Sequence, residues 1–246
     1  MKSLNTYIGE GGFFKNVGIE LVTVKTKNAL KNLIIKTIGK HGPNCDLNFI
    51  NTSKITNMSE LFRGIEFNGD ISKWDVSNVT SMAAMFANSK FDGDISNWDV
   101  SNVTFMSAMF NNSKFNGDIS NWDVRNVNDM STMFANSIFN GDISKWDVFN
   151  VTSMSAMFTN SKFNGDISEW DVRNVNDMST MFAYSKFNGD ISNWDVSNVD
   201  DMHDMFAVSE FNRDLSKWDV YKVTDTRGMF NGSKLKKLDK LPDWYK

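Results

Sequence analysis

The sequence predicts an α/β repeat solenoid, a coil of stacked 24-residue units that is capped at both ends, and three observations lead to this prediction. A tryptophan recurs every 24 residues, at Trp74, Trp98, Trp122, Trp146, Trp170, Trp194 and Trp218. A phenylalanine recurs with the same period, at Phe86, Phe110, Phe134, Phe158, Phe182, Phe206 and Phe230. An MxxMF motif ends at each of these phenylalanines and is incomplete only in the last copy, where Thr226 replaces the first Met. A fixed period of this length is typical of units that stack because none can bury its own apolar face.

The composition favours one elongated body without strong charge. The 246 residues include 30 acidic and 26 basic side chains, so the net charge is -4. A nucleic-acid-binding protein would need a basic face, and we therefore expect no nucleic-acid partner. Because the sequence has no run of 18 or more apolar residues, we expect no membrane span.

Residues 1–18 form a predicted N-terminal tail, MKSLNTYIGEGGFFKNVG. This segment has neither the continuous apolar core nor the small-residue cleavage site of a secretory signal. We therefore expect a cytoplasmic or virion-associated location and not a secreted one. A loosely docked tail and a tether to a larger assembly are both open interpretations of this segment.

Residues 19–43 are the predicted N-terminal cap. The segment IELVTVKT at 19–26 alternates apolar and polar residues, which indicates a strand. A helix is predicted to follow with Thr26 as its N-cap and Gly39, Gly42 and Pro43 at its end. Its apolar side chains share one face: Leu30, Leu33, Ile34 and Ile38. Such a helix suits the exposed apolar end of a repeat array.

The array itself is predicted to occupy residues 44–230, followed by a basic C-terminal cap at 231–246. Its first copy, residues 46–67, is degenerate but in register: Leu47, Ile50, Met58, Leu61 and Phe62 stand at the conserved apolar positions. At the other end Arg213 replaces the glycine of FNGD. Terminal repeats drift because one of their sides faces water.

Within one unit, the IxxWDVxNV segment predicts a short strand. The spacing of Ile95, Trp98 and Val100 follows the LxxLxL pattern of leucine-rich repeats, which turns alternate side chains inward. Apolar residues then recur at spacings of three and four, as in a short helix or 3-10 segment: Val103, Met106, Met109 and Phe110. We therefore predict a leucine-rich-repeat-like right-handed coil with one short parallel β-strand and one short helix or 3-10 segment per unit.

The unit FNGDISxWDVSNVTxM, with the lead-in LIIKTIGKHGPNCDLNFINTSKITNMSELF, resembles the BspA-like leucine-rich repeats of bacterial and phage-encoded proteins. The resemblance covers roughly residues 27–230. It implies a surface protein engaged in adhesion or partner binding, and it implies no catalysis.

Two columns of aspartates run down the array. One follows each Trp: Asp75, Asp99, Asp123, Asp147, Asp171, Asp195 and Asp219. The other closes each GD pair: Asp70, Asp94, Asp118, Asp142, Asp166, Asp190 and Asp214. We expect the GD column to accept backbone N–H bonds in turns and the WDV column to face solvent. Calcium bridging between neighbouring rungs is the alternative, but the GGxGxDxUx signature of calcium-binding repeats is absent, so we expect no calcium.

No arrangement of side chains indicates catalysis. Cys45 is a lone thiol and is predicted to be a small core residue. The two histidines, His41 and His203, have no partner that the sequence reveals. No Ser/His/Asp, paired-carboxylate or HExxH pattern stands out from the repeat. We predict that the protein is not an enzyme and that it has no catalytic, cofactor-binding or metal-binding residues.

Positions that vary within the constant frame indicate where a partner would bind. They stand just before each Trp and just after each WDV, and on the predicted strand they would share one face with the WDV aspartates. The predicted partner-binding residues are Lys73, Asp75, Asp99, Asp123, Arg125, Lys145, Asp147, Phe149, Glu169, Asp171, Arg173, Asp195 and Tyr221. Arg and aromatic residues are enriched in protein interfaces, which makes Phe149 between Arg125 and Arg173 the candidate anchor.

The sequence therefore predicts a non-enzymatic protein-interaction or adhesion scaffold with a protein partner. The alternative is a structural or decorating component of a virion or other large assembly, tethered by residues 1–18. A merely solvated face with drifting residues is the competing interpretation of the variable positions.

Overall fold

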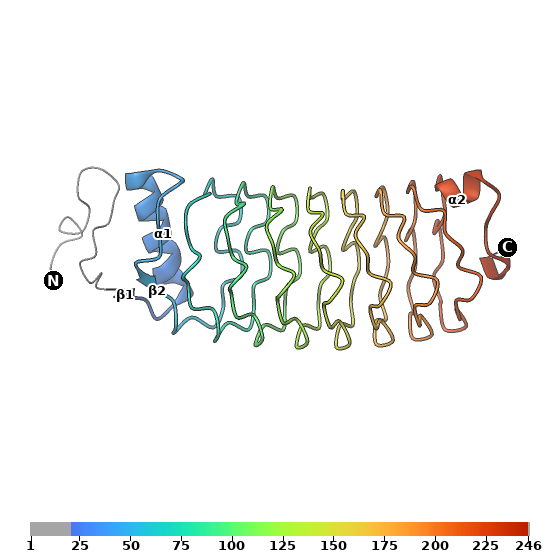
Figure 1. Cartoon of the computed structure of the whole chain (residues 1–246), viewed down its shortest axis with the longest axis horizontal. Coiled ribbons are helices and arrows are strands. Elements are labelled where there is room, and N and C mark those ends of the chain that lie inside the picture. The colour runs from blue at the N-terminus through green and yellow to red at the C-terminus, as the bar shows by residue number, and fades with distance from the viewer. Residues whose placement is uncertain (1–20, 246) are drawn as a thin grey trace.

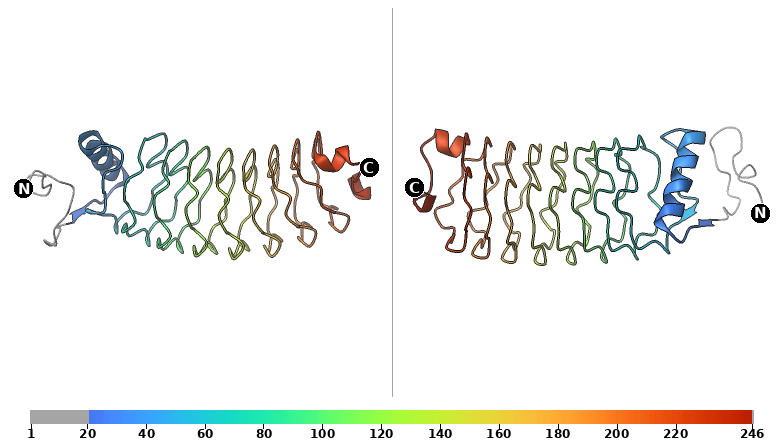
Figure 2. Two further views of the ribbon diagram at one scale, coloured as in Figure 1. Left: turned by 45° about the horizontal axis from the view of Figure 1, so that its top comes forward. Right: turned by 180° about the vertical axis from the view of Figure 1, so that it is seen from behind.

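The computed structural model describes residues 21–245 as a stack of loops, one for each 24-residue repeat, placed side by side along the long axis (Figure 1). Two further views show the same succession, with helix α1 (Lys27–His41) at one end and helix α2 (Lys234–Lys237) at the other (Figure 2). We call each loop a rung. The predicted repeat architecture is therefore confirmed. The predicted tail, residues 1–18, lies outside the described residues, and the boundaries at 43 and 230 stay predictions.

The N-terminal end of the stack is covered by strand β1 (Val22–Thr23) and by α1. Strand β1 pairs in parallel with β2 (Ile50–Asn51), which belongs to the first rung. The predicted N-cap is confirmed, because the Thr26 side chain accepts a hydrogen bond from the Ala29 backbone N. Of the residues predicted to end the helix, Gly42 is confirmed, since it follows His41 with φ 85° and donates a backbone bond to Ile38 O, whereas Gly39 lies within the helix.

Helix α1 closes the apolar end of the first rung. Its buried residues are Leu30, Ile34 and Thr37. Two lysines on the same helix reach the first rung, since Lys27 Nζ donates to Ser59 Oγ and Lys31 Nζ donates to Glu60 O. The helix thus supplies both apolar cover and hydrogen-bond donors to the end of the stack.

A continuous core of stacked side chains runs through all rungs. Phe86 and Phe110 have ring centroids 5.7 Å apart with planes 4° from parallel. The indoles of Trp170 and Trp194 stack at 6.5 Å and 3°, which confirms the predicted file of tryptophans. Each fully buried aromatic ring contributes about 4–6 kcal/mol as an upper bound, so the core is the main stabilising element.

One side of each rung, residues 80–89 and their equivalents, forms what we call the ladder wall. Alternate residues of this wall donate backbone N–H bonds of 2.7–3.1 Å to the next rung. In one rung the donors are Met106, Ala108, Phe110 and Asn112, and the acceptors in the next rung are Asp129, Ser131, Met133 and Ala135. The residues between the donors bond within their own rung, as Met109 N does to Met106 O at 3.1 Å. Neighbouring rungs are therefore joined here by the main chain itself.

The predicted short helix or 3-10 segment at MxxMF is wrong. Among the described residues, the MxxMF segments are turns and contain no helix. Ala108 and Asn112 adopt left-handed φ values of 55° and 50°, which interrupt any helical run. The interruption turns every second N–H toward the next rung, so bonds between rungs replace the bonds a helix would have made.

The predicted strand at WDV is also wrong. Parallel β-bridges join the residues that precede the first Met of MxxMF, as in Ser81 with Phe105 and Phe105 with Asp129. Around each Trp the chain instead forms two turns, and Trp98 N donates to Ile95 O at 3.2 Å within its own rung. The Asp that follows Trp bonds to the backbone two residues later, which favours a turn over an extended chain.

The side of each rung that carries the Trp, residues 92–103 and their equivalents, is called the turn wall below. From Asp92 onward, no backbone-to-backbone bond joins the turn walls of neighbouring rungs in the described part of the chain. Side chains make the links: Trp98 Nε1 donates to Ile71 O, and Asn102 Nδ2 donates to Ser77 O at 2.7 Å. Each link repeats from rung to rung. The turn wall is therefore held together by Trp and Asn side chains.

The C-terminal end extends the pattern of the stack. Helix α2 begins after Ser233, whose side chain accepts a bond from Lys236 N, and a short 3-10 helix, η2, spans Asp243–Tyr245. Trp244 Nε1 donates to Leu215 O at 2.9 Å, which is the bond that each Trp of the array makes to the rung before it. The predicted cap thus adds one further indole to the file of tryptophans.

Candidate protein-binding face

The thirteen predicted partner-binding residues lie on the turns that flank each Trp and not on a strand. Eleven are exposed, and the two half-buried residues are Asp123 and Asp171. The two turns recur at the same place in every rung, so the residues form columns along one side of the stack. The strand predicted to carry these residues is therefore wrong, and their role in partner binding stays a prediction.

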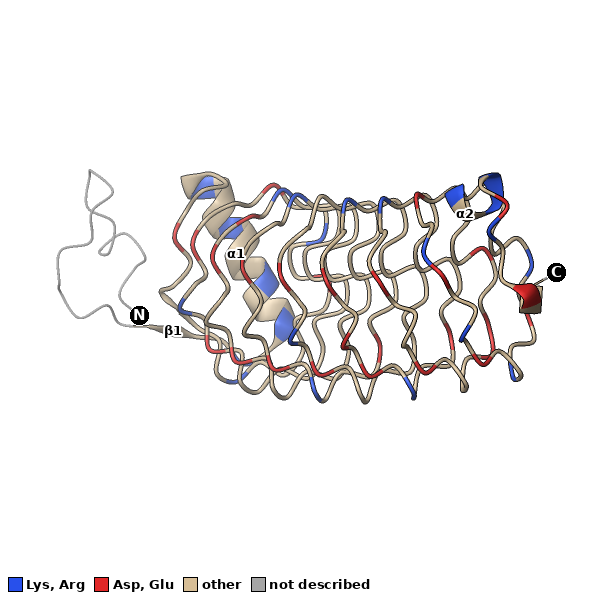
Figure 3. Cartoon of the chain, turned by 45° about the vertical axis from the view of Figure 1, so that its right-hand side comes forward, with Lys and Arg blue, Asp and Glu red and all other residues tan. Residues whose placement is uncertain are grey.

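Both aspartate columns are acceptors in their own turns. Asp118 Oδ1, in the GD column, accepts the backbone N of Ser120 at 2.9 Å. Asp99 Oδ1, in the WDV column, accepts both the backbone N and the Oγ of Ser101. The expectation for the GD column is confirmed. The WDV column is exposed as expected in most rungs, but it also shapes the turn that follows it. Figure 3 shows acidic residues at matching places on successive rungs.

These hydrogen bonds change the titration of the carboxylates. Bonds from the side chain and backbone of Ser101 lower the pKa of Asp99. Bonds from the backbone and side chain of Ser120 lower the pKa of Asp118, although the charge of Asp142 on the next rung acts in the opposite direction. The hydrogen bonds of the turn therefore lower the pKa of Asp118 by more than the repulsion between stacked carboxylates raises it. The absence of calcium stays a prediction.

Three consecutive rungs place Arg, Phe and Arg at the same turn position. Arg125 Nε donates to Asp123 Oδ1 at 2.8 Å, and Arg173 Nε donates to Asp171 Oδ1 at 2.8 Å. The guanidinium of Arg173 lies over the ring of Phe149, 5.9 Å from its centroid. The Phe149 residue is 42% exposed, so the ring keeps a free surface beside a fixed cation.

The asparagine links fix these three positions relative to one another. Asn150 Nδ2 donates to Arg125 O, Asn174 Nδ2 to Phe149 O and Asn198 Nδ2 to Arg173 O, each at 2.7 Å. Because the bonds end on the backbone of the three residues, they hold the backbone of the column in place. We call Arg125, Phe149 and Arg173 the Arg–Phe–Arg column.

The other predicted residues lie apart from this column. Lys73, Lys145 and Glu169 stand exposed on the turn before their Trp. Tyr221 is 95% exposed and is separated from Arg173 by the intervening rung of Ser197. The structure therefore unites the two Arg–Asp pairs and Phe149, and it leaves the remaining residues as separate exposed positions.

A second set of positions, most of them half-buried, was missed by the sequence analysis. It lies on the ladder wall, at the residues joined by β-bridges, where Phe105 is 46% exposed. Four aspartates occupy the same column: Asp129, Asp177, Asp201 and Asp225. The variability of this position between copies, from Asn57 to Asp225, is the signal that could have found it.

Two side-chain pairs lie at the C-terminal part of this second column. His203, for which the sequence shows no partner, has its Nδ1 2.8 Å from Asp201 Oδ1. In the next rung Arg227 Nε donates to Asp225 Oδ1 at 3.0 Å. Bonds from the side chain and backbone of Arg227 lower the pKa of Asp225 to about 2. Asp225 is therefore ionised throughout the physiological range.

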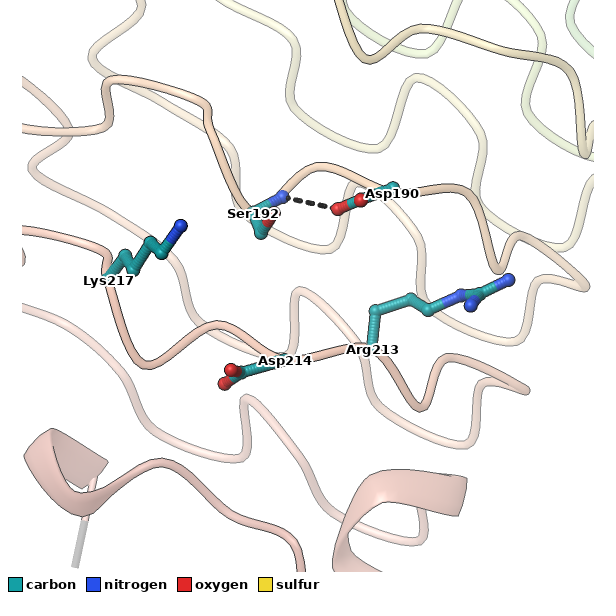
Figure 4. A pocket seen from close by; sticks show the side chains of 5 residues that line it. All are labelled: Asp190, Ser192, Arg213, Asp214 and Lys217. Carbon is teal, nitrogen blue, oxygen red and sulfur yellow. Dashed lines mark hydrogen bonds between the residues drawn. The ribbon is translucent and has the colours of Figure 1, made fainter.

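A shallow pocket of about 270 Å³ lies near the C-terminal end and is lined by Asp190, Ser192, Arg213, Asp214 and Lys217 (Figure 4). Its carboxylates already accept turn bonds, since Asp190 Oδ1 accepts Ser192 N at 3.0 Å and Asp214 Oδ1 accepts Ser216 N at 2.9 Å. Arg213 Nε donates to Asn188 O. The pocket is thus lined by acidic and basic side chains, and the hydrogen bonds of Asp190, Asp214 and Arg213 are made to the backbone of the repeats.

Cys45 is half-buried and packs against the core, in agreement with its predicted place. Burial raises the pKa of its thiol. A raised pKa leaves the sulfur protonated at neutral pH, so the residue lacks the thiolate that a nucleophile needs. No helix in the described part of the chain is long and apolar enough to cross a membrane.

Comparison with known families finds a family model that matches the chain twice. A family described as "Mycoplasma protein of unknown function, DUF285" matches residues 39–140 and again residues 135–244. No curated protein and no solved structure matches the chain. The two matches together span residues 39–244, which include the whole array of rungs.

Proposed function

We propose that this chain, which belongs to the DUF285 family, is a non-enzymatic scaffold that binds another protein through its turn wall. The proposal includes the finer assignment of a right-handed, leucine-rich-repeat-like coil of the BspA-like kind, with adhesion as the setting in which such binding is used. Its binding centre is the Arg–Phe–Arg column. Support comes from the chemistry of that column and from the rigidity of its frame.

The carrying observation is the exposed Phe149 ring beside the guanidinium of Arg173. An aromatic ring that is 42% exposed offers apolar surface that water solvates poorly. Two arginines flank it, and each is held in place by a carboxylate of its own rung. Aromatic and Arg side chains are enriched at protein interfaces, where a few residues carry most of the binding energy. The column therefore combines an apolar anchor with oriented cationic groups.

The frame supports binding because it is already ordered. A partner that meets side chains fixed by hydrogen bonds loses less entropy on binding than one that must order them. The three backbone positions are tied by asparagine bonds of 2.7 Å, and the Arg side chains are tied by ion pairs of 2.8 Å. The ion pairs are exposed and add little to stability, so their role is to orient the cations.

The repeat itself supplies the substitution that tests this proposal. Ser occupies the equivalent position in other rungs, as Ser77, Ser101 and Ser197 do. The triple change Arg125→Ser, Phe149→Ser and Arg173→Ser therefore restores the sequence of neighbouring rungs and should leave the fold intact. Wild-type and triple-variant proteins are immobilised and exposed to an extract of the source organism, and captured proteins are quantified by mass spectrometry.

A matched control removes two positive charges elsewhere, by Lys114→Ser and Lys162→Ser, at exposed positions outside the column. We expect the triple variant to capture at least tenfold less protein than the wild type. The control should capture as much protein as the wild type. Equal capture by the triple variant would remove this column from consideration as a binding site. Circular dichroism confirms that all three proteins are equally folded.

A further inference from the structure

Two consecutive rungs near the C-terminal end bring an imidazole and two carboxylates together on the ladder wall. Asp201 and His203 belong to one rung and Asp225 to the next. A β-bridge pairs Asp201 with Asp225, and Met202 N donates to Asp225 O at 2.9 Å. The backbone of the two rungs therefore fixes the register between these three residues.

The ligand atoms of the three side chains are close enough to share one ion. One carboxylate oxygen from each Asp and one ring nitrogen of His203 all lie within 4.8 Å of one another. A metal ion about 2.0–2.2 Å from each ligand needs ligand atoms roughly 3–3.5 Å apart, which small side-chain rotations supply from this starting arrangement. The side chains of His203 and Asp201 are 38% and 36% exposed, so an ion can reach them from solvent.

We propose that Asp201, His203 and Asp225 form a binding site for a divalent transition-metal ion, with Zn²⁺ as the representative ion. Imidazole nitrogen is a ligand for Zn²⁺, Cu²⁺ and Ni²⁺, whereas Ca²⁺ and Mg²⁺ take mainly oxygen ligands in larger number. Three protein ligands leave a fourth position for water. The ion would join two rungs through side chains at a place where the main chain already joins them.

The repeat makes this site specific to one pair of rungs. Positions equivalent to His203 hold Ser or Ala in the preceding rungs, as in Ser155 and Ser179. The rung before has the same pair of carboxylates, Asp177 and Asp201, but no imidazole between them. The stack therefore contains a natural comparison in which the carboxylates are present and the nitrogen ligand is absent.

Arg227 competes for one of the ligands. Its guanidinium bonds to both oxygens of Asp225, through Nε at 3.0 and 3.1 Å. The Arg227 side chain is 88% exposed, so its release to solvent costs little. A metal ion at Asp225 must displace this cation, and removal of Arg227 should therefore tighten metal binding.

The first experiment titrates the full chain with Zn²⁺ in a calorimeter and records thermal unfolding with and without the ion. We expect one ion per chain, and a rise in Tm of about 5 °C at a hundredfold excess over Kd. The variant His203→Ser restores the residue of other rungs and should bind at least tenfold more weakly. The variant Arg227→Ser, also a residue of other rungs, should bind severalfold more tightly.

A transfer experiment tests the geometry itself. The double variant Ser179→His and His203→Ser moves the imidazole one rung back, between Asp177 and Asp201. We expect zinc binding lost in His203→Ser to return in the double variant, and Asp225→Asn to have no further effect on it. In the wild type, by contrast, Asp225→Asn should weaken binding at least tenfold.

Three results would each overturn the proposal. The first is the absence of zinc heat and of any change in Tm for the wild type, with circular dichroism showing a folded chain. The second is equal zinc affinity of the wild type and His203→Ser, and the third is equal affinity of the wild type for Ca²⁺ and Zn²⁺, either of which would mean that exposed carboxylates alone attract cations. The proposal is independent of the Arg–Phe–Arg column, and failure of one leaves the other standing.

Discussion

The ladder wall and the turn wall carry the same number of repeats but join them by different means. On the ladder wall, backbone N–H groups such as those of Ala108 and Phe110 reach the next rung directly. On the turn wall, the Nε1 of Trp122 and the Nδ2 of Asn126 reach backward to carbonyls of the preceding rung. Side-chain identity therefore matters little for bonding on the first wall and decides it on the second. This difference explains why Trp and Asn are so regular in the WDVxNV segment.

The comparison also separates stability from binding. The positions that the core and the links leave free on the turn wall are the ones that vary, and they include Arg125, Phe149 and Arg173. A wall built from side-chain links tolerates change only at its remaining positions. Partner specificity can therefore evolve there without loss of the stack.

The largest loss of stability is expected when a phenylalanine ring is removed from the core between the two walls. Phe134 is fully buried between Phe110 and Phe158, at centroid distances of 5.7 and 5.8 Å. Phe134→Ala should lower the free energy of unfolding by about 3–5 kcal/mol, because it removes apolar contact and leaves a cavity. Urea unfolding followed by Trp fluorescence measures this. A loss below about 1 kcal/mol would mean that rungs unfold separately and that no common core exists.

A smaller loss of stability should follow when one hydrogen bond between neighbouring turn walls is removed. Trp146 Nε1 donates to Ile119 O at 3.1 Å, and Trp146→Phe leaves this carbonyl without that donor. We expect a cost of roughly 1–3 kcal/mol from the lost bond and the smaller ring. Met154→Leu, on the ladder wall of the same rung, keeps volume and breaks no hydrogen bond, so it should cost under about 1.5 kcal/mol. Equal losses for the two variants would contradict the role given to the indole N–H.

Two residues of one rung test the walls side by side. Asn150 Nδ2 is the donor from this rung to Arg125 O, whereas Thr152 Oγ1 shares its acceptor, Asn128 O, with the Thr152 backbone N. Asn150→Ala should cost about 1 kcal/mol, and Thr152→Val should cost only a few tenths, because the backbone bond remains. Chemical unfolding of both variants gives the comparison. A larger loss for Thr152→Val would reverse the assignment of the two walls.

Acid should weaken the turn wall through its aspartates. The pKa of Asp118, Asp142 and Asp166 lies below the ordinary 3.8, because the backbone and side chain of the following serine bond to the carboxylate. A lowered pKa in the folded state stabilises the fold above pH 3.8, and this contribution is lost as the pH falls through the folded pKa. Urea midpoints should thus be insensitive to these groups between pH 7 and about 5 and should fall below about pH 4.

A variant with Ala at Asp118, Asp142 and Asp166 isolates this effect. It should be less stable than the wild type at pH 7, and the difference between the two proteins should shrink below about pH 4. A constant difference over the whole range would mean that these carboxylates do not contribute through ionisation. The measurement is the same urea series at each pH.

Much of the fold could be predicted because the period is visible in the sequence. The file of Trp and the buried MxxMF residues follow from the spacing, and the N-cap at Thr26 follows from its residue type just before the helical pattern. The backbone between these residues could not be predicted. The apolar spacing of Ile95, Trp98 and Val100 fits a strand and a pair of turns equally well. The hydrogen bond from Ser101 N to the Asp99 side chain favours the turn. Left-handed φ at Ala108 likewise leaves no trace in residue type.

The candidate site, too, has features that could be predicted from the sequence and features that could not. The alignment of Arg125, Phe149 and Arg173 follows from the period, but the contact of Arg173 with Phe149 depends on side-chain direction. The group of His203 with Asp225 was missed because it joins two rungs on the ladder wall. Its register requires the β-bridges between positions 24 residues apart, and the sequence analysis had placed the strand elsewhere.

Hydrogen–deuterium exchange resolved to single amides tests the central claim most directly. Backbone amides of the ladder wall, such as Thr132, Phe134 and Asn136, bond to the next rung and should exchange only through opening of the stack. Amides of the turn wall in the adjacent segment, such as Ser144 and Phe149, bond to exposed carboxylates and should exchange at least a hundredfold faster. Equal protection of both sets would contradict an account in which the main chain joins the rungs on one wall and side chains join them on the other.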